Sequence, residues 1–190
     1  MYKVGIIGAG IGGSYLSYCL SKEGVDTIVF DFRVPHEKLC GGGVSYKTIE
    51  RFPIIRELPI PRKKIWKSTF ISPKEKEVTI DLEKPLTIFS RMDLDYSLLK
   101  KAVDLGAHFR KEKVQSFARE GNSWRIFTKK GDYKAEILVG ADGALSQYCS
   151  LNHHDIDINL SHWRTILVPG LYWPGAHLSF DHPWVTTTTT

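Results

Sequence analysis

Residues 1–31 read MYKVGIIGAGIGGSYLSYCLSKEGVDTIVFD, and their pattern decides the fold. An apolar run at 3–7 is typical of a buried parallel strand, and a second apolar run at 27–30 repeats it. Between the two runs, the segment GAGIGG at 8–13 leads into a predicted helix over 14–20. A strand, a tight turn, a helix and a second strand within about 30 residues form the context that a dinucleotide-binding motif requires.

The glycine spacing gives each position of this turn a task. Gly8 allows the tight turn, Gly10 lets the backbone approach a pyrophosphate, and Gly13 lets the helix pack closely on the strand. Gly12 completes the run and is counted with the predicted cofactor-binding residues. The N-terminus of the helix adds unpaired N–H groups and the positive end of a dipole. The turn is therefore predicted to bind phosphates.

Asp31 stands at the end of the second apolar run, where a carboxylate can accept hydrogen bonds from the ribose hydroxyls of an adenosine. Its charge would repel a 2′-phosphate, so FAD or NAD fits the pattern better than NADP. The alternative is a glycine-rich turn in an unrelated α/β domain. The helix that follows the turn places Leu16, Cys19 and Leu20 on one side, which is the expected buried face.

The middle of the chain predicts an insertion and a return to the first sheet. Alternating segments at 63–71 and 77–82 are expected to be half-exposed strands of an inserted antiparallel sheet. A helical stripe of Leu94, Leu98, Leu99 and Ala102 follows. Further strands and two hairpins then lead to a buried strand near 135–140. The predicted class is α/β, a Rossmann-like three-layer domain with an inserted antiparallel β-sheet.

Three more segments carry candidate ligand contacts. The run Cys40, Gly41, Gly42 and Gly43 could let a flat ligand lie close to bare backbone, or it is a flexible loop ahead of a helix capped by Ser45. Arg91 precedes the Leu-rich helix, where it could reach a phosphate or a ribose, or it is a solvated surface side chain. Asp142 and Gly143 follow the last buried strand, at the end where such sheets bind ligands.

Composition limits the remaining function classes. With 26 Lys and Arg against 21 Asp and Glu, the net charge is +5, which suits anionic ligands or an anionic membrane surface. The basic residues are scattered, so no nucleic-acid partner is expected. Cys19, Cys40 and Cys149 lie far apart without a CxxC pair, and no apolar run approaches the roughly 20 residues of a membrane span. A cytoplasmic protein, free or peripheral to a membrane, is predicted.

The order GAGIGG, CGGGVS, SRMDLDYSLLKKA and LVGADGALS resembles the flavoprotein superfamily of aromatic hydroxylases and geranylgeranyl reductases. The segment CGGGVS is similar to the geranylgeranyl reductase branch in particular. The resemblance covers about 1–146 and implies an FAD-binding domain over 1–150. It also implies reduction of isoprenoid or related double bonds by flavin hydride transfer, with NAD(P)H or another external electron donor.

Carried over position by position, the resemblance implies one continuous FAD site. Its phosphate and adenosine half would comprise Gly8, Gly10, Gly13, Asp31 and Val114, the last through its backbone next to the adenine. Its central and flavin half would comprise Arg91 at the phosphate–ribitol region, Cys40 and Gly41 to Gly43 beside the flavin, and Asp142 with Gly143 closing the site. In hydroxylases the Asp-Gly pair also serves an incoming nicotinamide cofactor.

Two questions stay open from the sequence. Cys40 is either a proton donor or flavin-tuning group, or a small apolar filler. Residues 151–190 lack the later motifs of the family, and their histidines have no metal-ligand spacing, so we expect an irregular or incomplete C-terminal segment and no metal site. The alternatives to the reductase are a hydroxylase or halogenase of the same superfamily, and a non-catalytic FAD-binding remnant.

Overall fold

A computed structural model describes residues 1–38 and 40–143 of the 190-residue chain. The segment 151–190, for which the sequence predicts an irregular structure, lies outside the described residues. So does the predicted domain boundary at 150.

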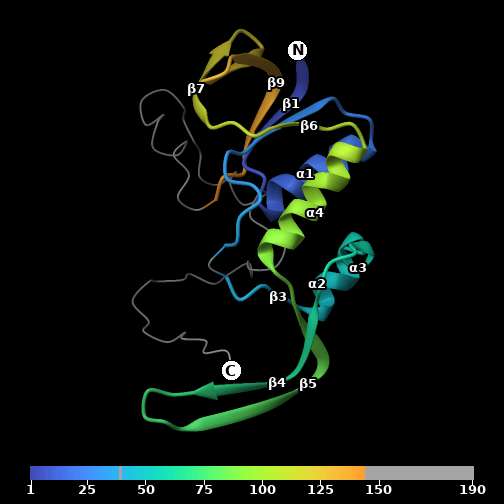
Figure 1. Ribbon diagram of the computed structural model, residues 1–190, viewed down its shortest axis with the longest axis vertical. Coiled ribbons are helices and arrows are strands. Elements are labelled where there is room, and N and C mark those ends of the chain that lie inside the picture. The colour runs from blue at the N-terminus through green and yellow to red at the C-terminus, as the bar shows by residue number, and fades with distance from the viewer. Residues whose placement is uncertain (39, 144–190) are drawn as a thin grey trace.

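The larger sheet contains six strands in the order β6-β2-β1-β9-β8-β7 (Figure 1). The four strands on one side are parallel, and the last two continue antiparallel as a meander. In chain order the strands are β1 (Tyr2–Ile7), β2 (Thr27–Phe30), β6 (His108–Arg110), β7 (Val114–Glu120), β8 (Ser123–Thr128) and β9 (Asp132–Gly140). The two predicted hairpins, with turns at 121–122 and 131–132, and a strand over 135–140 are confirmed. The strand is less buried than expected, since only Ala135 is buried and Ile137 is 50% exposed.

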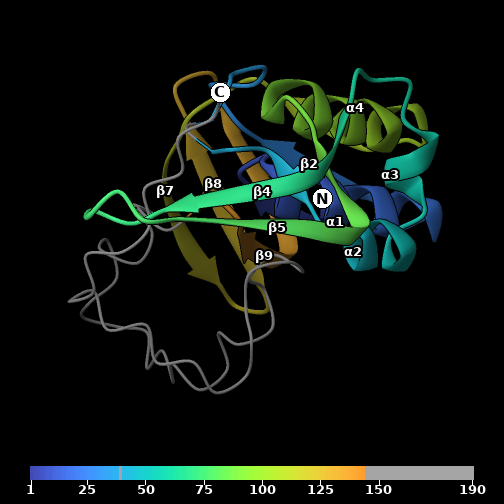
Figure 2. The ribbon, with the colours of Figure 1, turned by 90° about the horizontal axis from the view of Figure 1, so that it is seen from below.

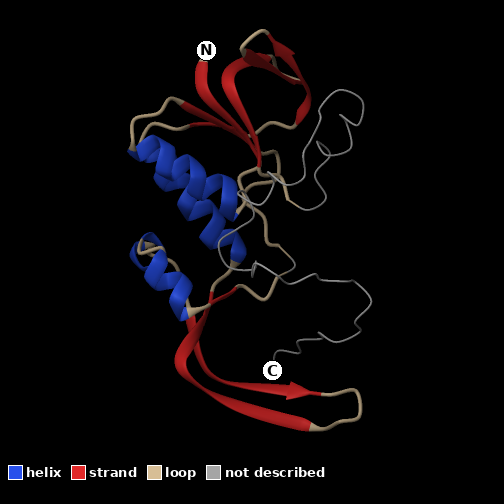
Figure 3. Ribbon diagram, turned by 180° about the vertical axis from the view of Figure 1, so that it is seen from behind, coloured by secondary structure: helices blue, strands red, loops and turns tan. Residues whose placement is uncertain are grey.

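Helices cover one face of this sheet, and the meander covers the other. Figure 3 shows α1 (Ile11–Lys22) and α4 (Arg91–Asp104) side by side on the helical face. On the opposite face Ile7 and Ile28 pack with Val114 of β7 and Ile126 of β8 in one apolar cluster. Strands β1 and β2 consist largely of buried apolar residues because both of their faces are covered. The predicted α/β class with three layers is confirmed.

The buried face of α1 differs from the expected one. Its most buried residues are Gly13, Ser14, Ser17 and Ser21, whereas the predicted Leu16, Cys19 and Leu20 are only partly buried. Small residues on this stripe let the helix backbone approach its neighbours closely. The hydroxyls of Ser14 and Ser17 donate to carbonyl oxygens at 2.9 Å, so their burial leaves no hydrogen bond unmade.

A second sheet is inserted between β2 and α4. It contains β3 (Gly43–Val44), β4 (Lys63–Ile71) and β5 (Glu77–Ile88) in the order β3-β5-β4, with short helices α2 (Tyr46–Arg51) and α3 (Ile54–Glu57) near its base. The inserted antiparallel sheet is thus confirmed, although 77–82 and 86–88 form one long strand. No helix within residues 1–38 and 40–143 is long and apolar enough to cross a membrane.

Strands β4 and β5 form a ribbon that extends away from the larger sheet (Figures 1 and 2). One side of the ribbon is polar, since Lys67 forms an ion pair with Asp81 and Thr69 bonds Thr79. On the other side Phe70 pairs with Val78, and Ile80 lies two residues further along. These three apolar side chains are 46–59% exposed. The ribbon is therefore amphipathic, with its apolar side open.

Candidate cofactor site

The glycine-rich turn at the end of β1 is held between its two neighbouring strands. The Gly8 N–H donates to the Phe30 carbonyl at 2.7 Å, and the Ala141 N–H donates to the Ile7 carbonyl at 2.7 Å. A Cβ on Gly13 would lie 1.9 Å from the Gly8 carbonyl oxygen, so only glycine permits this approach of α1 to the turn. Gly10 precedes the first turn of α1 with no side-chain cap, which leaves its N-terminal N–H groups open to an anion.

Asp31 ties the end of β2 to this turn. Its carboxylate is 7% exposed as a residue and accepts from the Ala9 N–H and the Arg33 N–H, each at 2.9 Å. A carboxylate has about four lone-pair sites, so capacity for a ribose hydroxyl is left. The side chain thus fixes the turn as well as standing where the sequence predicts a ribose contact.

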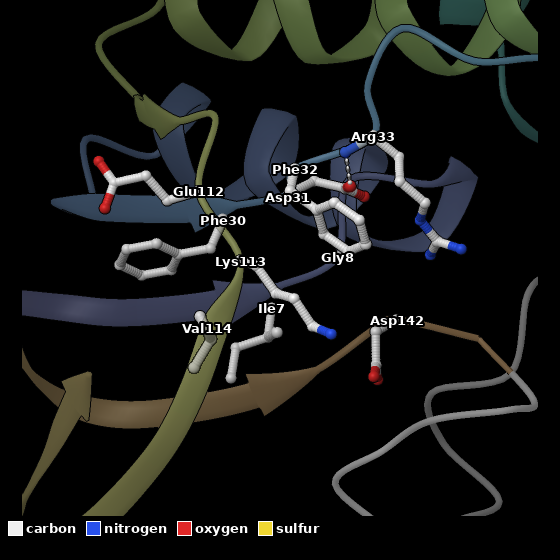
Figure 4. A pocket seen from close by; sticks show the side chains of 10 residues that line it. All are labelled: Ile7, Gly8, Phe30, Asp31, Phe32, Arg33, Glu112, Lys113, Val114 and Asp142. Atoms are coloured by element: carbon white, nitrogen blue, oxygen red, sulfur yellow. Dashed lines mark hydrogen bonds between the residues drawn. The ribbon is translucent and has the colours of Figure 1, made fainter. Parts of the chain in front are cut away.

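A pocket of about 170 Å³ opens beside Asp31 (Figure 4). Four residues that the sequence assigns to the cofactor site line it, namely Gly8, Asp31, Val114 and Asp142. They come from the ends of β1 and β2, the start of β7 and the segment after β9, which are far apart in the chain. The fold therefore brings together Gly8, Asp31 and Val114, which were predicted for the adenosine half. Asp142, which the resemblance assigned to the flavin half, lines the same pocket.

The sequence did not indicate the other six residues that line this pocket, namely Ile7, Phe30, Phe32, Arg33, Glu112 and Lys113. Phe32 is 47% exposed at the pocket, with the Arg33 guanidinium carbon 5.3 Å and the Lys113 Nζ 5.5 Å from its ring centroid. Cations over an aromatic ring hold it in place. The positions next to Asp31 and Val114 were the available signal.

The CGGG segment lies against the start of α4. Gly42 has a φ of +62°, and a Cβ there would lie 1.9 Å from the Phe89 carbonyl oxygen. The Phe89 N–H donates to the Gly42 carbonyl at 3.0 Å. Upstream, the Glu37 carboxylate accepts from the Ser90 hydroxyl at 2.6 Å and from the Arg91 N–H at 2.8 Å. The segment is tied to α4 at both of its ends.

Cys40 is exposed at this segment. The Gly42 N–H and the nearby Arg91 guanidinium lower the pKa of the Cys40 thiol below its ordinary value, against the raising effect of partial burial. A pocket of about 540 Å³ borders Cys40 and Gly41. Its lining contains the cations Lys38, Arg62 and Lys63 with one carboxylate, Glu37, so an excess of positive charge faces the pocket.

Arg91 does not point freely into solvent. Its guanidinium donates to both oxygens of Asp95, with Nε–Oδ1 at 3.1 Å and Nη2–Oδ2 at 3.0 Å. The two side chains are only 16% and 8% exposed. Burial raises the pKa of Asp95, and Arg91 is the main opposing influence. A phosphate or ribose contact by Arg91 stays a prediction, and the sequence did not indicate Asp95 as its partner.

Three of the remaining predicted glycines adjoin open space. Among the described residues, a Cβ added to Gly12, Gly41 or Gly143 would meet nothing within 4 Å. Gly43 starts β3 and pairs with Ile88, and a Cβ there would lie 3.3 Å from the Leu86 side chain. The predicted residues therefore gather along the carboxyl ends of the parallel strands and the start of α4.

Glu37 gives this site a pH-dependent anchor. The Ser90 hydroxyl, with the Arg91 and Met92 N–H groups, lowers the pKa of Glu37. Because this folded-state pKa is lower than the unfolded one, the stabilisation is present above the unfolded pKa and is lost as pH falls through the folded pKa. We expect Glu37→Gln to unfold at lower urea than the wild type at neutral pH, and the difference to vanish in acid.

Urea unfolding at a series of pH values measures this effect. Glu83→Gln is the matched control, because Glu83 is exposed on β5. A Glu37→Gln variant whose deficit stays constant down to acid pH would contradict the assignment.

The chain is similar in sequence to several curated proteins. The chain is 32% identical over 149 residues to an uncharacterised protein of Methanosarcina barkeri, covering 75% of this chain and 37% of the relative. It is 26% identical over 160 residues to the digeranylgeranylglycerophospholipid reductase of Methanocaldococcus jannaschii, covering 80% of this chain and 41% of the relative. No protein-family model matches. The chain thus spans less than half the length of these relatives.

Solved structures share the fold. A geranylgeranyl bacteriochlorophyll reductase-like protein of Thermoplasma acidophilum superposes with a TM-score of 0.64 at 22% identity, over 75% of this chain and 39% of the other. The halogenase PltM, solved with phloroglucinol and FAD, gives 0.63 at 21% identity, over 78% and 36%. The fold is therefore that of the FAD-binding flavoproteins. Within this class, the named geranylgeranyl reductases among the relatives support the geranylgeranyl reductase family, and the coverage fits the N-terminal portion of these proteins.

Proposed function

We propose that the protein binds FAD and serves in the reduction of isoprenoid or related hydrophobic alkenes. The observation that carries the proposal is the glycine turn, where Gly13 lies against Gly8 and the Asp31 carboxylate bonds the same turn beside an open pocket. This arrangement suits a dinucleotide because it offers a helix N-terminus to the pyrophosphate and a carboxylate to the ribose. The likeness to geranylgeranyl reductases and to FAD-binding structures supports a flavin as the other half of the dinucleotide.

The residues present fit both halves of the cofactor. The pocket of about 170 Å³ would hold the adenosine end between Asp31 and the backbone of Val114. The Gly41–Gly43 backbone would border the flavin, because glycines have no side chains that would keep a flat ring away from the backbone atoms. Asp142 and Gly143 follow β9 beside the glycine turn and would close the site between the two halves.

Bound FAD would supply hydride transfer from flavin N5 to one carbon of the alkene. The chain would orient the cofactor, exclude water and deliver a proton to the other carbon. Cys40 is the proposed proton donor or flavin-tuning group, because its exposed thiol borders the cationic pocket and has a lowered pKa. An NAD(P)H or another external donor would return the cofactor to its reduced state.

A lipid substrate would bring the protein to a membrane surface, and the net charge of +5 favours an anionic one. The named relatives act, by their names, on geranylgeranyl lipids or geranylgeranyl diphosphate. We extend only the substrate class to this chain, namely a small-molecule or isoprenoid lipid. No nucleic-acid partner is proposed.

The visible absorption spectrum of the purified chain after incubation with FAD is the first test. We expect the bands of a bound flavin, bleaching with dithionite under anaerobic conditions, and recovery of the bands when an isoprenoid alkene is added. Cys40→Ala should retain the bands and recover more slowly. A chain that takes up no FAD would overturn the proposal.

Two other functions are distinguishable in the same experiment. The halogenase among the structural neighbours favours an oxygen-dependent alternative, in which NADPH-driven oxygen consumption would depend on substrate and anaerobic turnover would fail. The other alternative is a protein that binds the nucleotide without turnover. In that case the bands would appear and bleach, but the alkene would not restore them.

A further inference from the structure

Charge around the first turn of α1 is not distributed as the sequence indicated. Arg91, the cation expected to reach a phosphate, is engaged by both oxygens of Asp95. This pair has no net charge. A second cation, Lys38, acts on the same carboxylate, so the three side chains together carry one excess positive charge.

The Lys38 ammonium lies directly over Gly10. Its Nζ is 2.9 Å from the position that a Cβ on Gly10 would occupy, and Asp95 Oδ2 is 3.8 Å from the same position. Gly10 is the N-cap of α1, at the positive end of the helix dipole. A cation in this place is repelled by the helix, and an anion between the two would be attracted by both.

The neighbours of Lys38 hold it there. Glu37, the preceding residue, is fixed to the N-terminus of α4 through Ser90 and Arg91. On the other side, Gly42 is hydrogen-bonded to Phe89. Lys38 itself is half-buried. The contacts of Glu37, directly before Lys38, therefore place the ammonium beside the glycine turn.

We infer that Lys38 is a direct ligand of the cofactor pyrophosphate, closing over the phosphates from the side opposite the α1 N-terminus. The inference rests on the proposed function and assigns to it a residue that the glycine motif does not contain. The α1 N–H groups would bind the phosphate oxygens from below and the ammonium from above. Arg91 would act on this contact indirectly, by neutralising Asp95, which otherwise competes for Lys38.

Binding of ADP, FAD and adenosine to the full chain tests the inference by calorimetry, apart from any turnover. Lys38→Gln should weaken ADP and FAD by about 10- to 100-fold, the usual range for one charge-assisted hydrogen bond. It should leave adenosine, which has no phosphate, within about twofold of wild type. The ADP affinity of the variant should also depend less steeply on salt concentration.

Two further variants sharpen the result. Lys38→Arg keeps the charge and should retain most of the ADP affinity, and Lys100→Gln removes an exposed lysine of α4 and should change none of the three ligands. Equal losses for ADP and adenosine would overturn the inference, since Lys38 would then only support the fold. Unchanged ADP binding would also overturn it. A wild type that binds ADP but no FAD would refute the proposed function. The ADP affinities of the wild type and Lys38→Gln would still decide whether Lys38 binds the pyrophosphate.

Discussion

The substitution Gly13→Ala is expected to lower the free energy of unfolding by about 3 kcal/mol. The new Cβ would lie 1.9 Å from the Gly8 carbonyl oxygen, which is backbone and cannot rotate away as a side chain would. Either α1 moves outward or the glycine turn distorts. Urea unfolding followed by circular dichroism measures the loss, and FAD uptake should fall with it because the same turn forms the phosphate site.

Gly12→Ala is the matched control for this experiment. Gly12 is also in the first turn of α1, but a Cβ there meets nothing within 4 Å. Alanine in a helix is favoured over glycine by up to about 1 kcal/mol, so the unfolding midpoint should stay or rise. If both variants lost stability equally, the close approach of Gly13 to Gly8 would not be the cause.

Arg91→Met is expected to cost about 3–5 kcal/mol of unfolding free energy, because it leaves the Asp95 carboxylate buried without its bidentate partner. Methionine preserves the length of the side chain. Burial would then raise the pKa of Asp95 with less opposition. The penalty should therefore be largest at neutral pH and shrink as pH falls and the carboxyl becomes protonated in the folded state.

The double variant Arg91→Met with Asp95→Leu separates the ion pair from the packing. Replacing both charges by apolar groups removes the unpaired carboxylate, and the double variant should be more stable than Arg91→Met alone. Urea unfolding of the single and double variants at neutral and acid pH provides the comparison. A double variant less stable than Arg91→Met would show that the aliphatic contacts of these side chains matter more than their charges.

Local patterns predicted the elements that depend on neighbouring residues. The sequence shows directly the apolar runs of β1 and β2 and the helical spacing of the apolar residues in α4. The glycines between β1 and β2 likewise mark the turn. Ser45 was predicted to cap the helix after the CGGG segment, and its hydroxyl accepts from the Thr48 N–H at 3.2 Å. These interactions span few residues, so the sequence contains most of their cause.

Contacts between distant segments were harder to predict. The serine stripe of α1 is buried because the helix packs closely on its neighbours, which hydrophobicity along one helix does not reveal. Likewise, β5 continues through Pro85 because most of its length pairs with β4. At the site, the positions of Arg91 and Lys38 depend on Asp95, a carboxylate whose burial follows from the packing of α4.

The open ribbon of β4 and β5 has a consequence for how the chain behaves in solution. Two-stranded hairpins are marginally stable alone, and this one has an apolar side and, within the described residues, strand edges without partners over 77–82. Both features favour lateral association of chains through backbone pairing. Within the described residues the ribbon is therefore a site where chains can pair edge to edge, and the net charge of +5 opposes such pairing.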